Sequence, residues 1–228
     1  MKLGAFGLAT SAVFLLMSAQ AFAATVIFDD FNKNQLAVDA PYPGSTSSNS
    51  IVFGSGTRTL TALNTTSNGN PVGATTIGAR GGILSFSNND QATGSGTVSY
   101  TNVGDISNGP NPYFFFDVGV FDNVANFTAY AEDKLGHMSS YQEVLSPSFS
   151  PFLYFSQFLG TADFNNLSKL SFKIDTTNVP GFGPVYAVDG SLKSISLNAP
   201  SAVPLPAGGI LLLVGLSGLF VLRSKKRA

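Results

Sequence analysis

The chain has 228 residues and a formal net charge of −1, and 44% of its residues are hydrophobic while only 11% are charged. It contains no cysteine and a single histidine, which excludes disulfide staples and transition-metal sites that need several Cys or His ligands. The basic residues do not outnumber the acidic ones, so the charge gives no indication that the chain binds nucleic acid.

The first residues predict a cleavable secretion signal. A positive residue, Lys2, precedes an apolar run over residues 6–17, and small residues flank Phe22 in Ala21-Phe22-Ala23. A charge, a short apolar run and a small-x-small motif are the three parts of a signal peptide. We expect cleavage between Ala23 and Ala24, so that residues 1–23 are removed. A retained helix is the alternative, but about 12 apolar residues are too few to cross a bilayer of ~30 Å.

Residues 24–202 are expected to form one domain. They hold seven basic and 13 acidic residues, a net charge of −6, so nucleic acid is not an expected partner. They are rich in Ser, Thr, Asn, Gly and Phe and contain two glutamates, a composition that favours strands over helices.

Four segments predict strands, in chain order 113–121, 126–132, 169–175 and 194–198. Apolar and polar residues alternate strictly in 169–175, which places Leu170, Phe172 and Ile174 on one face. Residues 113–121 are almost continuously apolar, as expected of a central strand covered on both sides. The alternative is a strand whose outer face binds a ligand.

Glycine-containing turn signals punctuate the domain at 54–56, 68–69, 81–82, 94–96, 108–110, 134–136, 179–181 and 189–190. Many short strands joined in this way predict an all-β fold, an antiparallel β-sandwich of the jelly-roll kind. Residues 41–50 and 64–73, dominated by Ser, Thr, Asn, Pro and Gly, are expected to be exposed loops.

Residues 203–228 predict a sorting signal in three parts. The segment opens with Val203, Pro204, Leu205, Pro206 and Ala207, continues with an uncharged apolar stretch over 207–222, and ends with Arg223, Lys225, Lys226 and Arg227. Two prolines keep the opening extended, where an enzyme can reach its backbone. The 16 apolar residues would form a helix of roughly 24 Å, enough for a transient hold in the inner membrane, with the basic cluster left in the cytoplasm.

This arrangement resembles the PEP-CTERM sorting signals of Gram-negative bacteria in their VPLPA form. In that family an exosortase, a membrane protease-transpeptidase, cuts near the proline motif and releases or re-anchors the exported domain. The resemblance implies export by the secretion machinery, a transient membrane anchor, and then a place on the cell surface or secretion. The commoner form has Glu where Leu205 stands, so a variant processing enzyme is expected. An ordinary C-terminal anchor is the alternative, although such an anchor needs no Pro-x-Pro.

A weaker resemblance concerns the domain. Phe28-Asp29-Asp30-Phe31 near its start and Tyr186-Ala187-Val188-Asp189-Gly190 near its end resemble the first and last strands of jelly-roll carbohydrate-binding modules. In such modules these strands lie side by side, and acidic residues from both often hold a structural calcium ion. The resemblance implies Asp30 and Asp189 as calcium ligands, with Asp29 in reserve. The alternative is that these aspartates cap backbone N–H groups at turns.

The sequence offers no convincing catalytic set, because its single histidine, His137, lies in an expected turn. Tyr42, Tyr113, Tyr141 and Tyr154 are candidates for stacking against sugar rings, since each offers a flat face and a polar tip.

We therefore expect a non-enzymatic surface or matrix protein that binds extracellular polysaccharide. Two alternatives stay open. One is a polysaccharide hydrolase that uses Glu132 or Glu143, which would require two facing carboxylates about 5 to 10 Å apart. The other is a purely structural biofilm component.

Overall fold

The computed structural model describes residues 26–39, 46–65, 73–89, 91–107, 111–146 and 152–198. Both predicted processing segments lie outside the described residues: the signal peptide with its Ala23–Ala24 junction, and residues 203–228 with the proline motif, the apolar stretch and the basic cluster. No helix in the described part of the chain is long and apolar enough to cross a membrane.

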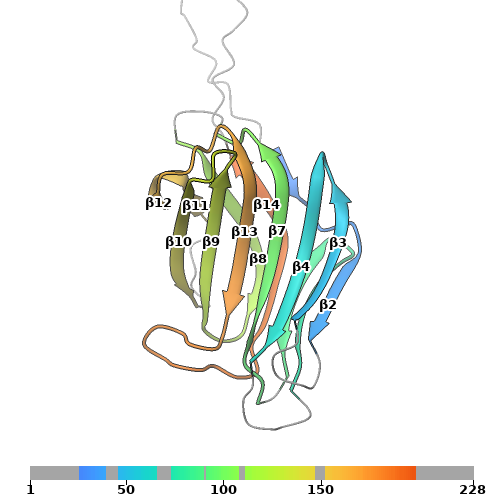
Figure 1. Cartoon of the computed structure of the whole chain (residues 1–228). Coiled ribbons are helices and arrows are strands. Elements are labelled where there is room, and N and C mark those ends of the chain that lie inside the picture. Colours follow the sequence, from blue (N-terminus) through green and yellow to red (C-terminus); the bar gives the residue numbers. More distant parts are fainter. Residues whose placement is uncertain are drawn as a thin grey trace, which may run out of the picture. The chain divides into compact units, whose positions relative to one another are not determined.

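The described residues form two antiparallel sheets packed as a sandwich (Figure 1). Sheet A runs in the order β11 (Phe152–Tyr154), β8 (Tyr113–Phe121), β14 (Asp189–Asn198), β6 (Ile83–Asn88), β5 (Thr75–Arg80) and β2 (Gln35–Asp39), and β1 (Val26–Asp29) also pairs with β14. Sheet B runs in the order β12 (Leu159–Gly160), β10 (Met138–Leu145), β9 (Ala125–Asp133), β13 (Leu167–Asp175), β7 (Gly94–Gly104), β4 (Gly56–Asn64) and β3 (Thr46–Phe53). One turn of 3-10 helix, η1 (Phe155–Gln157), follows β11. The predicted all-β antiparallel sandwich is confirmed.

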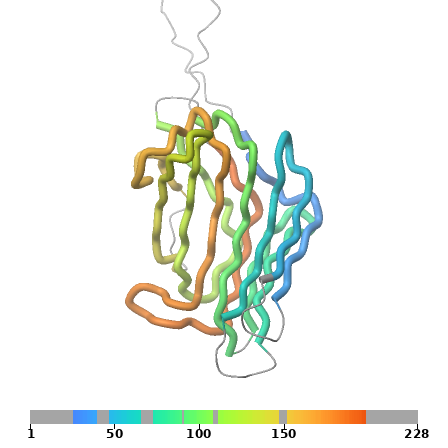
Figure 2. The backbone as a smooth tube through the Cα atoms, in the orientation of Figure 1, coloured from blue at the N-terminus to red at the C-terminus, as the bar shows by residue number. Residues whose placement is uncertain are grey.

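The chain winds between the two sheets in the manner of a jelly roll (Figure 2). The hairpins β3–β4, β5–β6 and β9–β10 stay within one sheet, whereas the connections from β2 to β3, β4 to β5, β6 to β7, β7 to β8 and β8 to β9 cross between sheets. β1 pairs antiparallel with β14, with Val26 opposite Leu197. The first and last strands therefore lie side by side, as the resemblance to carbohydrate-binding modules implied.

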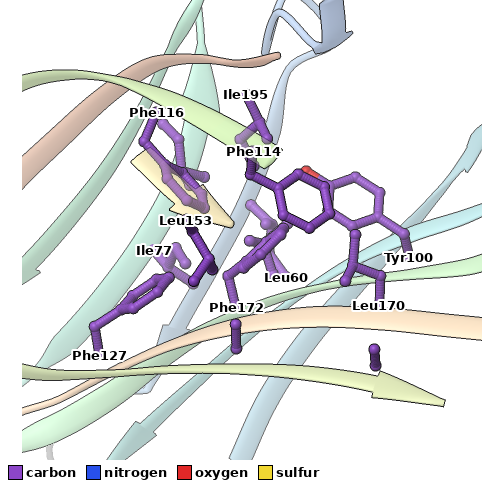
Figure 3. Packing of buried hydrophobic residues seen from close by; sticks show 14 of the residues in the cluster. Leu60, Ile77, Tyr100, Phe114, Phe116, Phe127, Leu153, Leu170, Phe172 and Ile195 are labelled. Carbon is purple, nitrogen blue, oxygen red and sulfur yellow. The ribbon is translucent and has the colours of Figure 1, made fainter. Parts of the chain in front are cut away.

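Phenylalanine rings from both sheets meet in the core (Figure 3). Phe114 and Phe116 of β8 lie with their ring centroids 5.3 and 5.2 Å from that of Phe172 on β13, nearly perpendicular to it. Edge-to-face contacts of this kind are favoured between aromatic rings. Leu170 and Phe172 are buried and Ile174 is partly buried, so the predicted inner face of 169–175 is confirmed.

One predicted loop and one predicted turn are wrong, because their small residues belong to strands. Residues 46–50 belong to β3, because Ser48 and Ser50 pair their hydroxyls with Thr61 and Thr59 across the hairpin, at 3.0 and 2.8 Å. Residues 94–96 belong to β7, where a Cβ on Gly96 would stand 2.6 Å from the Phe86 ring.

Gly190 has a similar explanation. Asp189 and Gly190 open β14 instead of forming a turn, and a Cβ on Gly190 would stand 2.4 Å from the Phe121 ring. Glycine here makes room for a core ring within a strand, whereas the sequence pattern takes it as a turn signal.

Candidate functional site

The outer face of β8 is open to solvent. Phe114 and Phe116 point into the core, but Tyr113 and Phe115 on the other face are only partly buried. Among the described residues, the three-residue strand β11 flanks β8 on the side away from β14. The prediction that 113–121 is covered on both sides is therefore wrong.

Four aromatic side chains gather on this outer face, and we name them the aromatic patch: Tyr113, Phe115, Phe152 and Tyr154. The register of β8 and β11 places Phe152 opposite Phe115 and Tyr154 opposite Tyr113, and residues paired in this way point to the same face. Ring centroids lie 5.2 Å apart in both pairs, and 5.5 Å apart between Tyr113 and Phe152. Phe152 and Tyr154 remain 41% and 42% exposed, so their rings can contact a ligand.

Backbone and side-chain hydrogen bonds fix β11 against β8. Between its two outward residues, Leu153 points inward and is buried. The Tyr154 backbone N–H donates to Oε1 of Gln157 at 2.9 Å, and the Phe155 N–H donates to the Pro112 carbonyl at 3.0 Å. The patch is thus held in one arrangement before any ligand arrives, which lowers the entropy cost of binding.

The row of outward side chains extends beyond the patch across sheet A. Phe115 is opposite Ser196 of β14, which is only 4% exposed, and Ser196 is in turn opposite Ile27 of β1, which is 61% exposed. Together with Phe152, the row crosses four strands, roughly 14 Å at ~4.8 Å per strand. Exposed rings together with the hydroxyls of Tyr113 and Tyr154 suit a ligand that has apolar faces and polar edges, such as a chain of sugar rings.

The structure brings together two of the four predicted stacking tyrosines. Tyr113 and Tyr154 belong to the patch, whereas Tyr42 lies outside the described residues. Tyr141 packs against the core from β10, and its hydroxyl donates to Oε2 of Glu143. Burial and this bond to a carboxylate raise the pKa of Tyr141 to about 12. Tyr141 is therefore not part of an outer stacking surface.

Glu132 and Glu143 do not face each other. In the register of β9 and β10, Glu132 is opposite Met138, while Glu143 is opposite the inward-pointing Phe127. Successive residues of a strand alternate between faces, so Glu143 lies on the inner face of sheet B and Glu132 on its outer face. Because the two carboxylates lie on opposite faces of the sheet and five register positions apart, they do not form the carboxylate pair of a glycosidase.

The two predicted calcium ligands also lie apart. Asp29 is opposite Ile195, and Asp30 follows it, whereas Asp189 stands six residues before Ile195 on β14. At ~3.3 Å per residue this separates Asp30 from Asp189 by more than about 15 Å, while calcium ligands lie at about 2.3 to 2.6 Å from the ion. Asp30 and Asp189 therefore do not form one site.

Both positions take part in local hydrogen bonds, Asp30 through its carboxylate and Asp189 through its backbone N–H. The carboxylate of Asp30 accepts the Asn32 backbone N–H at 3.1 Å and the Asn32 side-chain amide at 2.7 Å, and these bonds lower the pKa of Asp30. The Asp189 backbone N–H donates to the Asp122 carboxylate at 2.8 Å. Among the described residues no group of three or more His, Asp or Glu could hold a metal. Calcium binding stays a prediction, tested by whether added Ca²⁺ raises the melting temperature and a chelator lowers it.

Asp29, the reserve calcium ligand, is in a buried ion pair. Its carboxylate lies 2.8 Å from Nη1 of Arg58, and both side chains are almost fully buried. It also accepts the Tyr100 hydroxyl at 2.7 Å and the Phe31 backbone N–H at 2.9 Å. Burial and the negative charge of Asp29 raise the pKa of Tyr100 well above its usual range. Spacing in the sequence does not predict this pair, because Asp29 and Arg58 are 29 positions apart and lie on strands of different sheets.

The fold thus defines the class of the protein as an antiparallel β-sandwich with an aromatic outer face. The chain matches no protein-family model, and no curated protein matches it. Among solved structures it is similar to the family 11 carbohydrate-binding module of the cellulase Lic26A-Cel5E of Clostridium thermocellum. The identity is 14% and the TM-score 0.40, over 78% of this chain and 96% of the module.

Two further likenesses are of the same order. A family 11 module of Clostridium thermocellum in complex with a β-1,3-1,4-mixed-linked tetrasaccharide is 14% identical, with a TM-score of 0.35 over 72% of this chain and 95% of that one. PfGH50B is 12% identical, with a TM-score of 0.35 over 68% of this chain and 22% of that protein. At these TM-scores the likenesses assign neither a family nor a ligand to this chain.

Proposed function

We propose that this protein is a non-enzymatic, exported surface or matrix protein that binds extracellular polysaccharide through the aromatic patch. The observation that carries the proposal is the contact of four aromatic rings on the outer face of β8 and β11, two of them about 40% exposed. Exposed aromatic side chains rarely cluster on a sheet face without a binding role, because such a cluster leaves apolar surface in water.

The net charge of the domain limits the kind of polysaccharide that it can bind. Residues 24–202 carry a net charge of −6, so a strongly acidic polysaccharide would be repelled at low ionic strength. A neutral polysaccharide, whose sugar rings present C–H faces to aromatic rings and hydroxyls to the two tyrosines, fits the patch best.

Affinity electrophoresis through gels that contain neutral polysaccharides tests the proposal. Phe152→Ala and Tyr154→Ala should each weaken binding by about tenfold or more, as removal of a central aromatic contact commonly does. Tyr130→Ala is the matched control, because Tyr130 is 41% exposed on the outer face of sheet B, away from the patch. Equal retardation of all three variants and the parent would refute the patch as the site.

We also propose that the C-terminal segment is removed by an exosortase-type enzyme that reads residues 203–207. Its support is the order of proline motif, apolar stretch and basic cluster in the sequence. Intact-mass analysis of the exported protein should show an N-terminus at Ala24 and the loss of Arg223 to Ala228. In a Pro204→Ala, Pro206→Ala variant the tail should remain and hold the protein in the membrane fraction. Native protein that keeps both Met1 and Ala228 would contradict this proposal.

A further inference from the structure

A second candidate binding site lies inside the sandwich, between the two sheets. It is a cavity of about 350 Å³, within the range of about 300 to 1,000 Å³ found for small-molecule sites. Its walls include six phenylalanine rings: Phe86, Phe115, Phe116, Phe121, Phe127 and Phe172. Figure 3 shows three of them, Phe116, Phe127 and Phe172, directed toward one another from β8, β9 and β13.

Two strand glycines help to shape the wall of the cavity. Gly96 of β7 and Gly190 of β14 both line it, and neither supplies a side chain to the interior. The bulk of a Cβ at either position would meet the Phe86 or the Phe121 ring. The two glycines therefore let these rings lie close against the strands, where the rings form part of the cavity wall.

The opening lies along β8. Outward residues of this strand, Asp117 and Gly119, line the same space as the inward Val118, so the cavity reaches the surface there. β11 pairs only with residues 113–115, and no described strand lies beside the rest of that edge of β8. Register shifts between β8 and β14 further loosen the sheet at this place.

The polar lining is confined to a few side chains and limits the chemistry of the ligand. Among the lining residues only Asp117 is charged, and Ser146 and Ser191 supply hydroxyls. Asp117 is 45% exposed, and its carboxylate lies 4.0 Å from Nζ of Lys193, so it remains mostly in water at the opening. An apolar chamber with a carboxylate and hydroxyls favours a hydrocarbon chain with a neutral, hydrogen-bonding head and disfavours an anionic head.

We propose that this cavity binds a neutral, hydroxyl-headed hydrocarbon chain, with the chain between the sheets and the hydroxyl beside Asp117. This site is separate from the proposed polysaccharide site, although Phe115 borders both. The ligand class is that of a long-chain alcohol or an acylglycerol.

Calorimetric titration of the full chain with n-alkanols from pentanol to nonanol tests the proposal. Affinity should rise about fourfold for each added methylene, the factor that corresponds to ~0.8 kcal/mol per buried methylene, until the cavity is full. Octanoate should bind more weakly than octanol, because its carboxylate faces that of Asp117. Absence of binding, affinity independent of chain length, or octanoate binding as tightly as octanol would each overturn the proposal.

Two matched variants locate the binding. Val118→Phe, which projects a ring into the cavity, should lower octanol affinity at least tenfold, whereas Val120→Phe, two residues along the same strand and outside the cavity lining, should not. Leu192→Phe on β14 serves as a second filling variant should Val118→Phe fail to fold. In polysaccharide gels, Val118→Phe should be retarded as much as the parent protein. This comparison separates a failure of the cavity proposal from a failure of the aromatic patch proposal. Octanol affinity unchanged in a folded filling variant would contradict the proposed site.

Discussion

At the scale of single residues, the feature that most needs matched partners is the buried charged cluster around Arg58, inside the sandwich. Its Nε donates to Oε1 of Gln35 at 2.8 Å, its Nη1 to Asp29, and its Nη2 to the Lys33 carbonyl. The described residues leave no buried side-chain nitrogen or oxygen unsatisfied. Because Arg58 lies on β4 of sheet B and Asp29 and Gln35 on strands of sheet A, the cluster ties the two sheets together at one place.

Breaking this cluster should be costly. Asp29→Ala leaves the buried guanidinium without its counter-ion and should lower the free energy of unfolding by about 3 to 5 kcal/mol in urea denaturation. The exposed Lys193–Asp117 pair gives the contrast: Lys193→Ala should change it by less than about 0.5 kcal/mol. Comparable effects of the two substitutions would mean that the cluster is not buried as described.

Asp133 makes stability depend on pH. Its side chain is 1% exposed and accepts the backbone N–H groups of Leu135, His137 and Asp163 at 2.8, 3.0 and 3.1 Å, with Nδ1 of His137 at 2.9 Å. Burial alone would raise the pKa of Asp133, but the hydrogen bonds outweigh it and lower the pKa from 3.8 to about 2.

A carboxyl group whose pKa is lowered by folding stabilises the native state above its unfolded pKa, and this contribution disappears as pH falls through the folded pKa. The parent protein should therefore lose stability between about pH 4 and pH 2, and Asp133→Asn should lose less over that interval. Urea midpoints measured from pH 6 to pH 2 provide the comparison. Parallel curves for the two proteins would show that Asp133 does not carry this dependence.

At the scale of elements, close strand approach dictates where glycine is required. A Cβ on Gly56, at the start of β4, would lie 1.8 Å from the Thr101 carbonyl oxygen of β7. Gly81, in the β5–β6 turn, has a φ of +58° and no atom near its absent Cβ.

The two glycines should therefore respond differently to substitution. Gly56→Ala forces backbone to move in two strands and should cost about 3 kcal/mol, whereas Gly81→Ala meets only the strain of positive φ and should cost about 1 kcal/mol. Gly81→Asn should cost less still, because Asn tolerates this conformation. Thermal unfolding ranks the three variants, and a Gly56→Ala protein as stable as Gly81→Ala would argue against the β4–β7 register.

Strand patterns in the sequence were sufficient for some elements and not for others. Alternation in 169–175 predicted the inner face of β13, because a half-buried strand displays its environment along its own residues. Residues 113–121 misled, since a run of apolar residues fits both a covered strand and one with an aromatic outer face. The difference depends on whether another part of the chain packs over that face, which the residues of the strand do not record.

The candidate site was half predictable for the same reason. Tyr113 and Tyr154 could be chosen by residue type, because a tyrosine ring with a polar tip suits a wet binding surface. Phe115 and Phe152 were not among the candidates, because only tyrosines were considered for stacking. Only the pairing of β8 with β11, which brings together segments some 40 residues apart, places all four rings on one face.

On the scale of the whole molecule, the two outer faces differ in chemistry. The outer face of sheet A carries the aromatic patch, whereas that of sheet B carries paired hydroxyls, such as Ser48 with Thr61 and Thr57 with Thr101 at 3.0 and 2.8 Å. Hydroxyls that already bond to each other have less hydrogen-bonding capacity left for a ligand. Exposed aromatic rings, in contrast, are stabilised when a ligand removes their apolar surface from water. We therefore expect the protein to meet polysaccharide with sheet A.

Amide shift mapping by NMR during titration with a neutral polysaccharide tests this orientation most directly. Perturbed amides should cluster on β8 and β11, at residues 113–115 and 152–154, and on the neighbouring part of β14, with sheet B unaffected. Perturbations centred on β3, β4 and β7, or none with any neutral polysaccharide, would contradict binding at the aromatic patch.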